Sequence, residues 1–264
     1  TVGHAFCSGP SFMRSLLSLL VFSSRHERAR HVPKSALITA TSTRMFASGT
    51  SESSETDSGG LLGIIFDMDG TLTEPNAIDF AAMYSRNGLI KHPTDDIVRM
   101  INRLPAEQRD KAMQVIEEEE MAGCERMVLR THLMEILSAA GRANIRVALS
   151  TRNCDKAVQI FLRRAGLPQT VFSPMLHRDS LSVSKPDPAV ARHVLEQWGV
   201  EAGQEGRVWF VGDSMDDILC GRGAGCSTCL MLTPQHSEVP RHQQHLVDIS
   251  VHSLQQLADH LLLM

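Results

Sequence analysis

Two aspartates stand one residue apart, directly behind an apolar segment of the chain. Asp67 and Asp69 follow the run 61–66, and Gly70 and Thr71 come next in the sequence "DMDGT". An Asp-Gly pair is common in ordinary turns, where the acids are simply solvated. The pair therefore predicts chemistry only if other reactive side chains reach the same place.

Three further segments carry such side chains. They are "LSTRN", "SKPDP" and "GDSMDD", and their polar residues are Ser150, Thr151, Arg152, Lys185, Asp213, Ser214, Asp216 and Asp217. Each segment follows an apolar run or precedes a helical pattern. What matters is whether the fold brings them together.

Short apolar runs alternate with helical patterns from residue 60 onward, which predicts an α/β fold: a Rossmann-like parallel sheet with helices on both faces. The predicted strands are 61–66, 145–149, 170–172, 207–211 and 228–232. Helices are expected from Asn153 or Asp155 to Gly166, over 188–198, from Ser214, and over 253–264. Strands that feed helices at this pace place all their carboxyl ends along one edge of the sheet, where open α/β folds bind ligands.

The four polar segments would then converge on one crevice. Crowded carboxylates repel one another unless a cation neutralises them, and oxygen ligands favour Mg²⁺. Mg²⁺, a lysine and a hydroxyl together suit a phosphate group. The sequence therefore predicts a phosphoryl-transfer site.

The segments "DMDGTLT", "LST", "KPDP" and "GDSMDD", in this order, closely resemble the four motifs of the haloacid dehalogenase superfamily. Within it, the chain resembles the phosphoglycolate-phosphatase-like hydrolases with a small helical cap. The resemblance covers about residues 60–235. It implies a phosphoric monoester hydrolase that needs Mg²⁺.

The resemblance also implies roles for individual residues. Asp67 would be the nucleophile that forms an aspartyl-phosphate, and Asp69 the general acid and base. Thr151 and Lys185 would hold the phosphate, with Gly70, Thr71 and Arg152 as further phosphate- or substrate-binding candidates. Mg²⁺ would bind Asp67, the backbone carbonyl of Asp69, Asp213 and Asp217, whereas Asp216 fits the pattern less well. Arg152 departs from many relatives: its guanidinium would bind a substrate anion or pair with an acid of the cap.

The expected substrate is a small-molecule phosphate ester, phosphoglycolate-like or a sugar phosphate. Two alternatives stay open: a phosphomutase, which would use the same residues, and a catalytically silent binding protein on the same fold. An acid at Asp69 disfavours a dehalogenase, because the resembling dehalogenases lack one there.

A helical block at 76–137 interrupts the α/β rhythm and is interpreted as the cap, which leaves 60–75 and 138–264 as the catalytic core. A cap excludes water and reads the part of the substrate beyond the phosphate. Asn76, Asp79 and Arg86 are its candidate polar groups. The glutamate run 117–120 is interpreted as a solvated helix face instead of a cation site.

Residues 1–59 are rich in serine and arginine at first and polar later, which predicts a transit peptide and a linker. The protein is expected in a chloroplast or mitochondrion, or in the cytoplasm if this segment is not cleaved. Beyond residue 48 the chain holds 20 basic and 29 acidic residues, which disfavours nucleic acid as a partner. The apolar stretch 16–22 is too short to span a membrane. The oligomeric state is not predicted.

Six scattered cysteines indicate reduced thiols. Cys226 and Cys229, with His242 and His245, come near a zinc-ligand spacing whose last gap is one residue short. We expect both cysteines in the core instead, because cysteine is often buried.

Overall fold

The computed structural model describes residues 60–91, 96–234, 238–239 and 241–262. The predicted transit peptide and linker lie outside these residues. Within the described part of the chain, no helix combines the length and the apolar character that a membrane crossing requires.

The core is one six-stranded sheet in the order β3-β2-β1-β4-β5-β6, with every neighbouring pair parallel. The strands are β1 (Gly63–Phe66), β2 (Arg146–Ser150), β3 (Met175–Leu176), β4 (Val208–Gly212), β5 (Ser227–Met231) and β6 (Ile249–Val251). Four predicted strands are confirmed to within two residues. The prediction of a strand at 170–172 is wrong, because the strand in this part of the chain is β3, which has two residues and begins at Met175. The sequence did not predict β6.

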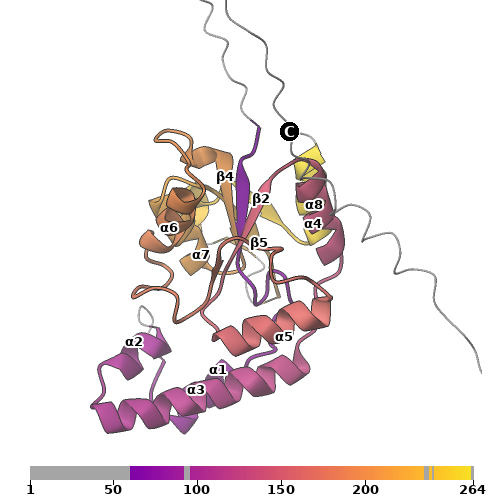
Figure 1. Cartoon of the computed structure of the whole chain (residues 1–264). Coiled ribbons are helices and arrows are strands. Elements are labelled where there is room, and N and C mark those ends of the chain that lie inside the picture. Colours follow the sequence, from indigo (N-terminus) through magenta and orange to yellow (C-terminus); the bar gives the residue numbers. More distant parts are fainter. Residues whose placement is uncertain (1–59, 92–95, 235–237, 240, 263–264) are drawn as a thin grey trace, which may run out of the picture. The chain divides into compact units, whose positions relative to one another are not determined.

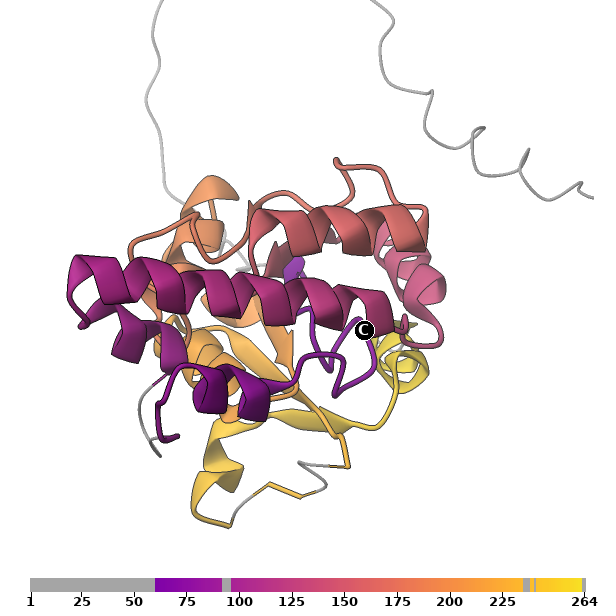
Figure 2. The ribbon, with the colours of Figure 1, turned by 90° about the horizontal axis from the view of Figure 1, so that it is seen from below.

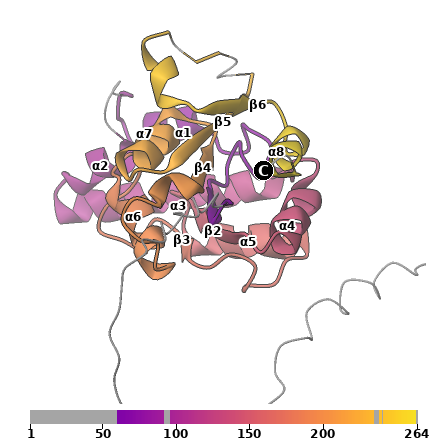
Figure 3. The same cartoon turned by 90° about the horizontal axis from the view of Figure 1, so that it is seen from above.

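Helices cover both faces of the sheet, as predicted. One face is packed by α4 (Leu133–Arg142), α5 (Asp155–Ala165) and α8 (Leu254–Leu262), and the other by α6 (Ala189–Gln197) and α7 (Met215–Gly223). Figure 3 shows these two groups on opposite sides of the strands. Two short 3-10 helices, Glu205–Arg207 and Arg241–Leu246, complete this part. On the α6 side, β1 begins with Gly63, where a Cβ would lie 2.2 Å from the Trp198 ring, so only glycine lets this ring pack against the strand.

The ends of α5 and α7 show known capping patterns, but one predicted N-cap is wrong. Ser214 begins α7 with a capping box in which its hydroxyl and backbone N–H both donate to the Asp217 carboxylate. Gly166 ends α5 with a positive φ of 65°, as glycine after a helix usually does. The N-cap of α5 is Cys154 and makes no side-chain cap bond, so the prediction of Asn153 or Asp155 as the cap was wrong.

The inserted helices are α1 (Phe80–Arg86), α2 (Ile97–Asn102) and α3 (Ala106–Arg126). They share a small apolar cluster of their own, with Ile78, Met83, Ile101 and Ile116 buried in it. In Figure 1 these helices lie below the strand ends, and Figure 2 shows α3 running alongside α5. Helix α4 crosses residue 137, the expected end of the cap, and packs with α8 against the sheet.

Candidate active site

The register of the sheet brings the predicted site residues to one level. Phe66 pairs with Leu149 of β2 and with Val211 of β4. The residues that follow these three, including Asp67 and Ser150, therefore stand side by side at the carboxyl edge of the sheet. The Asp67 N–H donates to the Val211 carbonyl at 2.9 Å, which fixes the backbone of the first motif to the neighbouring strand.

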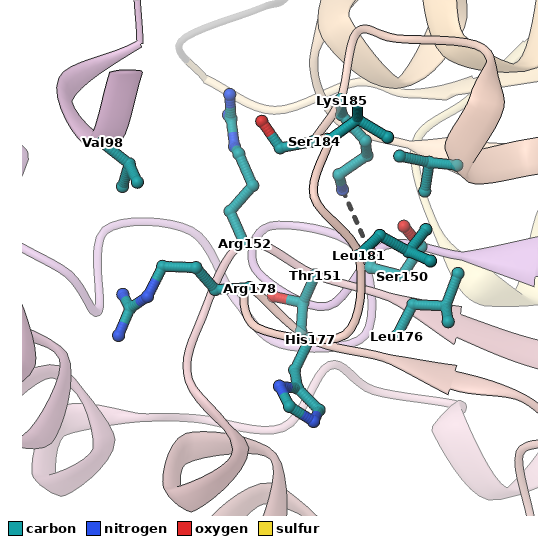
Figure 4. Close-up of a pocket in the computed structure, with 12 residues that line it drawn as sticks. Val98, Ser150, Thr151, Arg152, Leu176, His177, Arg178, Leu181, Ser184 and Lys185 are labelled. Atoms are coloured by element: carbon teal, nitrogen blue, oxygen red, sulfur yellow. Dashed lines mark hydrogen bonds between the residues drawn. The ribbon is translucent and has the colours of Figure 1, made fainter. Parts of the chain in front are cut away.

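Lys185 reaches this edge from the segment in front of α6. Its side chain is buried, and its Nζ lies 2.5 Å from Asp67 Oδ1, 2.7 Å from Asp217 Oδ1 and 2.9 Å from the Ser150 carbonyl oxygen. The last of these bonds is drawn in Figure 4. The two carboxylates raise the pKa of Lys185 although burial opposes this, so the lysine is charged.

Three acids form a candidate metal centre. One carboxylate oxygen from each of Asp67, Asp213 and Asp217 lies within 4.8 Å of the other two. Burial, followed by the charges of Asp67 and Asp217, raises the pKa of Asp213 to about 8. Burial raises the pKa of Asp67 to about 6 although Lys185 opposes it, whereas Lys185 outweighs burial and lowers the pKa of Asp217.

This donor set fits Mg²⁺. Asp217 Oδ1 is buried and touches the Lys185 ammonium, but it accepts no hydrogen bond of acceptable geometry from the described residues. Lys185 contacts two of the three carboxylates, and burial raises the pKa of Asp67 and Asp213, so a further positive charge would favour their ionised forms. Buried oxygen ligands with uncompensated negative charge are what a hard divalent cation binds.

Gly70 lets the first motif approach this centre. Its φ is +79°, and a Cβ at this position would lie 2.0 Å from Asp213 Oδ2. The Gly70 carbonyl accepts a hydrogen bond of 2.5 Å from the buried Arg130, which holds the turn from the other side. Thr71 is fully buried, and its hydroxyl has no hydrogen-bond partner among the described residues.

Asp69 has a different hydrogen-bond partner from Asp67. Asn153 Nδ2 donates to Asp69 Oδ2 at 2.7 Å. Burial and then the charge of Asp67 raise the pKa of Asp69 to about 7. Two neighbouring acids in one motif thus differ in their contacts, as acid and nucleophile roles require.

The pocket beside these residues lies between the sheet edge and the cap. Figure 4 shows Thr151, Arg152, Arg178 and Lys185 around it, with Val98 from α2 on the far side. Thr151 is buried, and its hydroxyl accepts a hydrogen bond of 3.2 Å from the Asn153 N–H. This arrangement can hold a phosphate between Thr151 and Lys185 and the remainder of a small ester under the cap.

Arg152 pairs with acids from both sides of the cleft. Its Nη1 lies 3.1 Å from Asp96 Oδ2 at the start of α2 and 2.7 Å from Asp216 Oδ2. Although burial lowers the pKa of Arg152, Asp96 and then Asp216 raise it above its ordinary value. The structure therefore places Arg152 on a cap acid, one of its two predicted partners, and Asp216 lies outside the candidate metal centre and pairs with Arg152.

The prediction that the glutamates at 117–120 form a solvated helix face is wrong at one position. Glu117 pairs with Lys156, and Glu118 and Glu119 pair with Arg86 on α1, all at least partly exposed. Glu120 is instead 3% exposed and forms an ion pair with Arg178. Position on the helix carries the signal: Glu120 lies four residues after the buried Ile116, on the same face of α3.

Other predicted cap groups have structural roles. Asp79 caps α1 through a 2.9 Å hydrogen bond from Ala82 N–H, and Asn76 adopts a positive φ of 69°.

Cys226 and Cys229 are buried in the clusters on opposite faces of the sheet, as predicted. Burial raises the pKa of Cys226 to about 12 and that of Cys229 further.

Comparisons with known proteins agree with this geometry. The family model "Haloacid dehalogenase-like hydrolase" matches residues 64–231. A haloacid dehalogenase-like hydrolase domain-containing protein of Arabidopsis thaliana is 35% identical over 65% of this chain and 71% of its own length. A phosphoglycolate phosphatase of Psychrobacter arcticus is 28% identical over 62% of this chain and 80% of its own length.

A solved hydrolase structure from Pseudomonas syringae superposes with a TM-score of 0.63 at 17% identity, over 77% of this chain and 99% of that one. At this identity the likeness shows the fold alone. The chain therefore belongs to the haloacid dehalogenase-like hydrolase family, and within it the chain is similar to phosphoglycolate phosphatases.

Proposed function

We propose that the protein is a Mg²⁺-dependent phosphatase that hydrolyses a small organic phosphate monoester through an aspartyl-phosphate on Asp67. The observation that carries this proposal is the contact of Lys185 with both Asp67 and Asp217 at the edge of the metal cluster. A fixed positive charge beside a carboxylate nucleophile is suited to receive a phosphate group.

In the first half-reaction a carboxylate oxygen of Asp67 attacks phosphorus, and the bond from phosphorus to the ester oxygen breaks. Asp69 gives its proton to that oxygen, so the alcohol leaves neutral. A pKa raised to about 7 supports this role, because the acid retains a proton near neutral pH. In the second half-reaction Asp69 takes a proton from water, whose oxygen attacks phosphorus and releases phosphate from Asp67.

Asp67, Asp213, Asp217 and the backbone carbonyl of Asp69 would hold Mg²⁺. When bound, this ion supplies positive charge that neutralises both the acids and the phosphate oxygens. Lys185 and Thr151 orient the phosphate against Asp67, and a covalent intermediate divides one difficult displacement into two easier steps. Gly70 and Thr71 complete the turn that faces the phosphate.

The substrate class follows from the small pocket under the cap and from the name of the Psychrobacter relative, a phosphoglycolate phosphatase. We propose a phosphoglycolate-like ester or a sugar phosphate. Arg152 and Arg178 both line this pocket, and each is already paired with an acid of the cap.

The test is a panel of phosphoglycolate, glycerol phosphates, sugar phosphates and p-nitrophenyl phosphate, assayed for free phosphate with Mg²⁺ or with EDTA. We expect Mg²⁺-dependent release that Asp67→Asn reduces at least about 1,000-fold. The matched control is Asp155→Asn, an exposed acid at the start of α5, which should keep full activity. Isomerised sugar phosphate with little free phosphate would identify a mutase, and turnover of no ester would favour a silent binding protein.

A further inference from the structure

Asn153 contacts both Thr151, a proposed phosphate-binding residue, and Asp69, the proposed general acid. It is 6% exposed, and its side-chain amide donates to Asp69 Oδ2 at 2.7 Å. Its backbone N–H donates to Thr151 Oγ1 at 3.2 Å. Because the amide occupies Oδ2, the other oxygen of Asp69 is the one that can carry the transferred proton.

The peptide group that follows Asn153 is held on both sides. The carbonyl of Asn153 accepts a hydrogen bond of 2.9 Å from the Arg178 N–H. The N–H of the same peptide group, which belongs to Cys154, donates to Glu120 Oε2 at 3.3 Å. Since the side chains of Glu120 and Arg178 also pair with each other, one ion pair fixes this peptide plane.

Glu120 comes from cap helix α3, whereas Asn153 and Arg178 belong to the core. The side chains of Glu120 and Arg178 are 3% and 11% exposed. An ion pair shielded from water is stronger than an exposed one, so this pair holds the cap to the core. A second pair between α3 and the core, Glu117 with Lys156, is 41% and 70% exposed and lacks this constraint.

We propose that Asn153 is a positioning residue for Asp69, and that the buried pair of Glu120 and Arg178 makes this positioning depend on the docked cap. The inference rests on the proposed function, in which Asp69 protonates the leaving oxygen. Mispositioned acid should hinder departure of an alcohol but not of a group that leaves readily as an anion.

The experiment compares two esters on the full chain: p-nitrophenyl phosphate, whose leaving group needs little protonation, and the alkyl ester of the panel that the wild type turns over fastest. For Asn153→Ala we expect kcat/KM on the alkyl ester to fall about 10- to 100-fold, but kcat/KM on p-nitrophenyl phosphate to fall less than about threefold. The ratio kcat/KM covers only the steps up to departure of the alcohol, so it leaves out the second half-reaction, in which Asp69 acts as base whichever ester was bound. If the alanine variant does not fold, Asn153→Asp keeps the shape and removes the donor.

Glu120→Gln tests the link to the cap. It should show the same preference for p-nitrophenyl phosphate, with a smaller loss on the alkyl ester. Its matched control, Glu117→Gln on the exposed pair, should stay within about twofold of wild type on both esters.

Equal losses in kcat/KM on the two esters, or no loss on either, would overturn the role of Asn153. A Glu120→Gln variant that behaves like Glu117→Gln would overturn the dependence on the cap. Failure of the proposed function has a separate signature, because the wild type itself would then release no phosphate from either ester, and this inference would fall with it.

Discussion

Lys185→Met tests the charge balance of the site without relying on catalysis. Lys185 is 3% exposed and is the cation in direct contact with both Asp67 and Asp217. Methionine has a similar length and no charge, so the substitution leaves two buried carboxylates facing each other without their lysine. Removing one partner of a buried ion pair typically costs about 3 to 5 kcal/mol.

This cost is a large fraction of the roughly 5 to 15 kcal/mol that stabilises an ordinary domain. It corresponds to a fall in Tm of about 6 to 20 °C for a domain of this size. Bound Mg²⁺ replaces part of the missing charge, and a ligand at about 100 times its Kd adds roughly 2.7 kcal/mol. We therefore expect Mg²⁺ to stabilise the variant more than it stabilises the wild type.

The assay is urea unfolding of both proteins in EDTA and in Mg²⁺. Lys156→Met is the control, because it also removes a lysine from an ion pair, but Lys156 is 70% exposed and its partner Glu117 is 41% exposed. Its free energy of unfolding should change by less than about 1 kcal/mol. A Lys185→Met protein as stable as wild type in EDTA, or no extra gain from Mg²⁺, would refute the reasoning.

Three further predictions concern the turn, the cap and the thiols. Gly70→Ala places a methyl group 2.0 Å from Asp213 Oδ2 at a φ of +79°. The backbone cost alone is about 1 to 2 kcal/mol, and half-saturation of activity should need more Mg²⁺, measured by titration. Asp96→Ala removes the N-cap of α2 and a contact of Arg152, so amide exchange should accelerate in α2 and not in α6; equal exchange would contradict this. Burial raises the pKa of Cys220 and Cys226 to about 12, so at pH 8 they remain thiols, and a disulfide reagent should modify them only after unfolding.

The contiguous motifs made much of the site predictable. Asp67, Lys185 and Asp213 each lie within a few residues of a strand or helix end, and parallel strands bring such ends to one edge. Four strands were predictable because each is a short apolar run in the sequence. Since the predicted roles depend on relative position along the sheet edge, strand bounds wrong by one or two residues did not matter.

The missed residues depend on contacts between distant segments. Glu120 belongs to a run of four glutamates, and composition cannot tell which of them turns inward. Arg178 lies in a loop after a two-residue strand, where no periodic pattern exists. Asn153 reads as a helix cap because asparagine is common there, yet its side chain bonds to Asp69, 84 residues away.

The two arginines that line the pocket, Arg152 and Arg178, each form an ion pair with an acid of the cap. Asp96 and Asp216 pair with Arg152, and Glu120 pairs with Arg178. Arg152 acts on Asp67 and Asp217 through its charge, which lowers the pKa of both carboxyls but less than burial or Lys185 affects them. Lys185 touches Asp67 directly, so it and the proposed Mg²⁺ are placed to meet the charge of an incoming phosphate. Asp96 and Glu120 of the cap hold the two guanidiniums in the wall of the pocket. The two proposed ester classes differ at these arginines: a sugar phosphate presents an uncharged alcohol portion to them, whereas a phosphoglycolate-like ester presents a carboxylate that competes with the acids already paired with them.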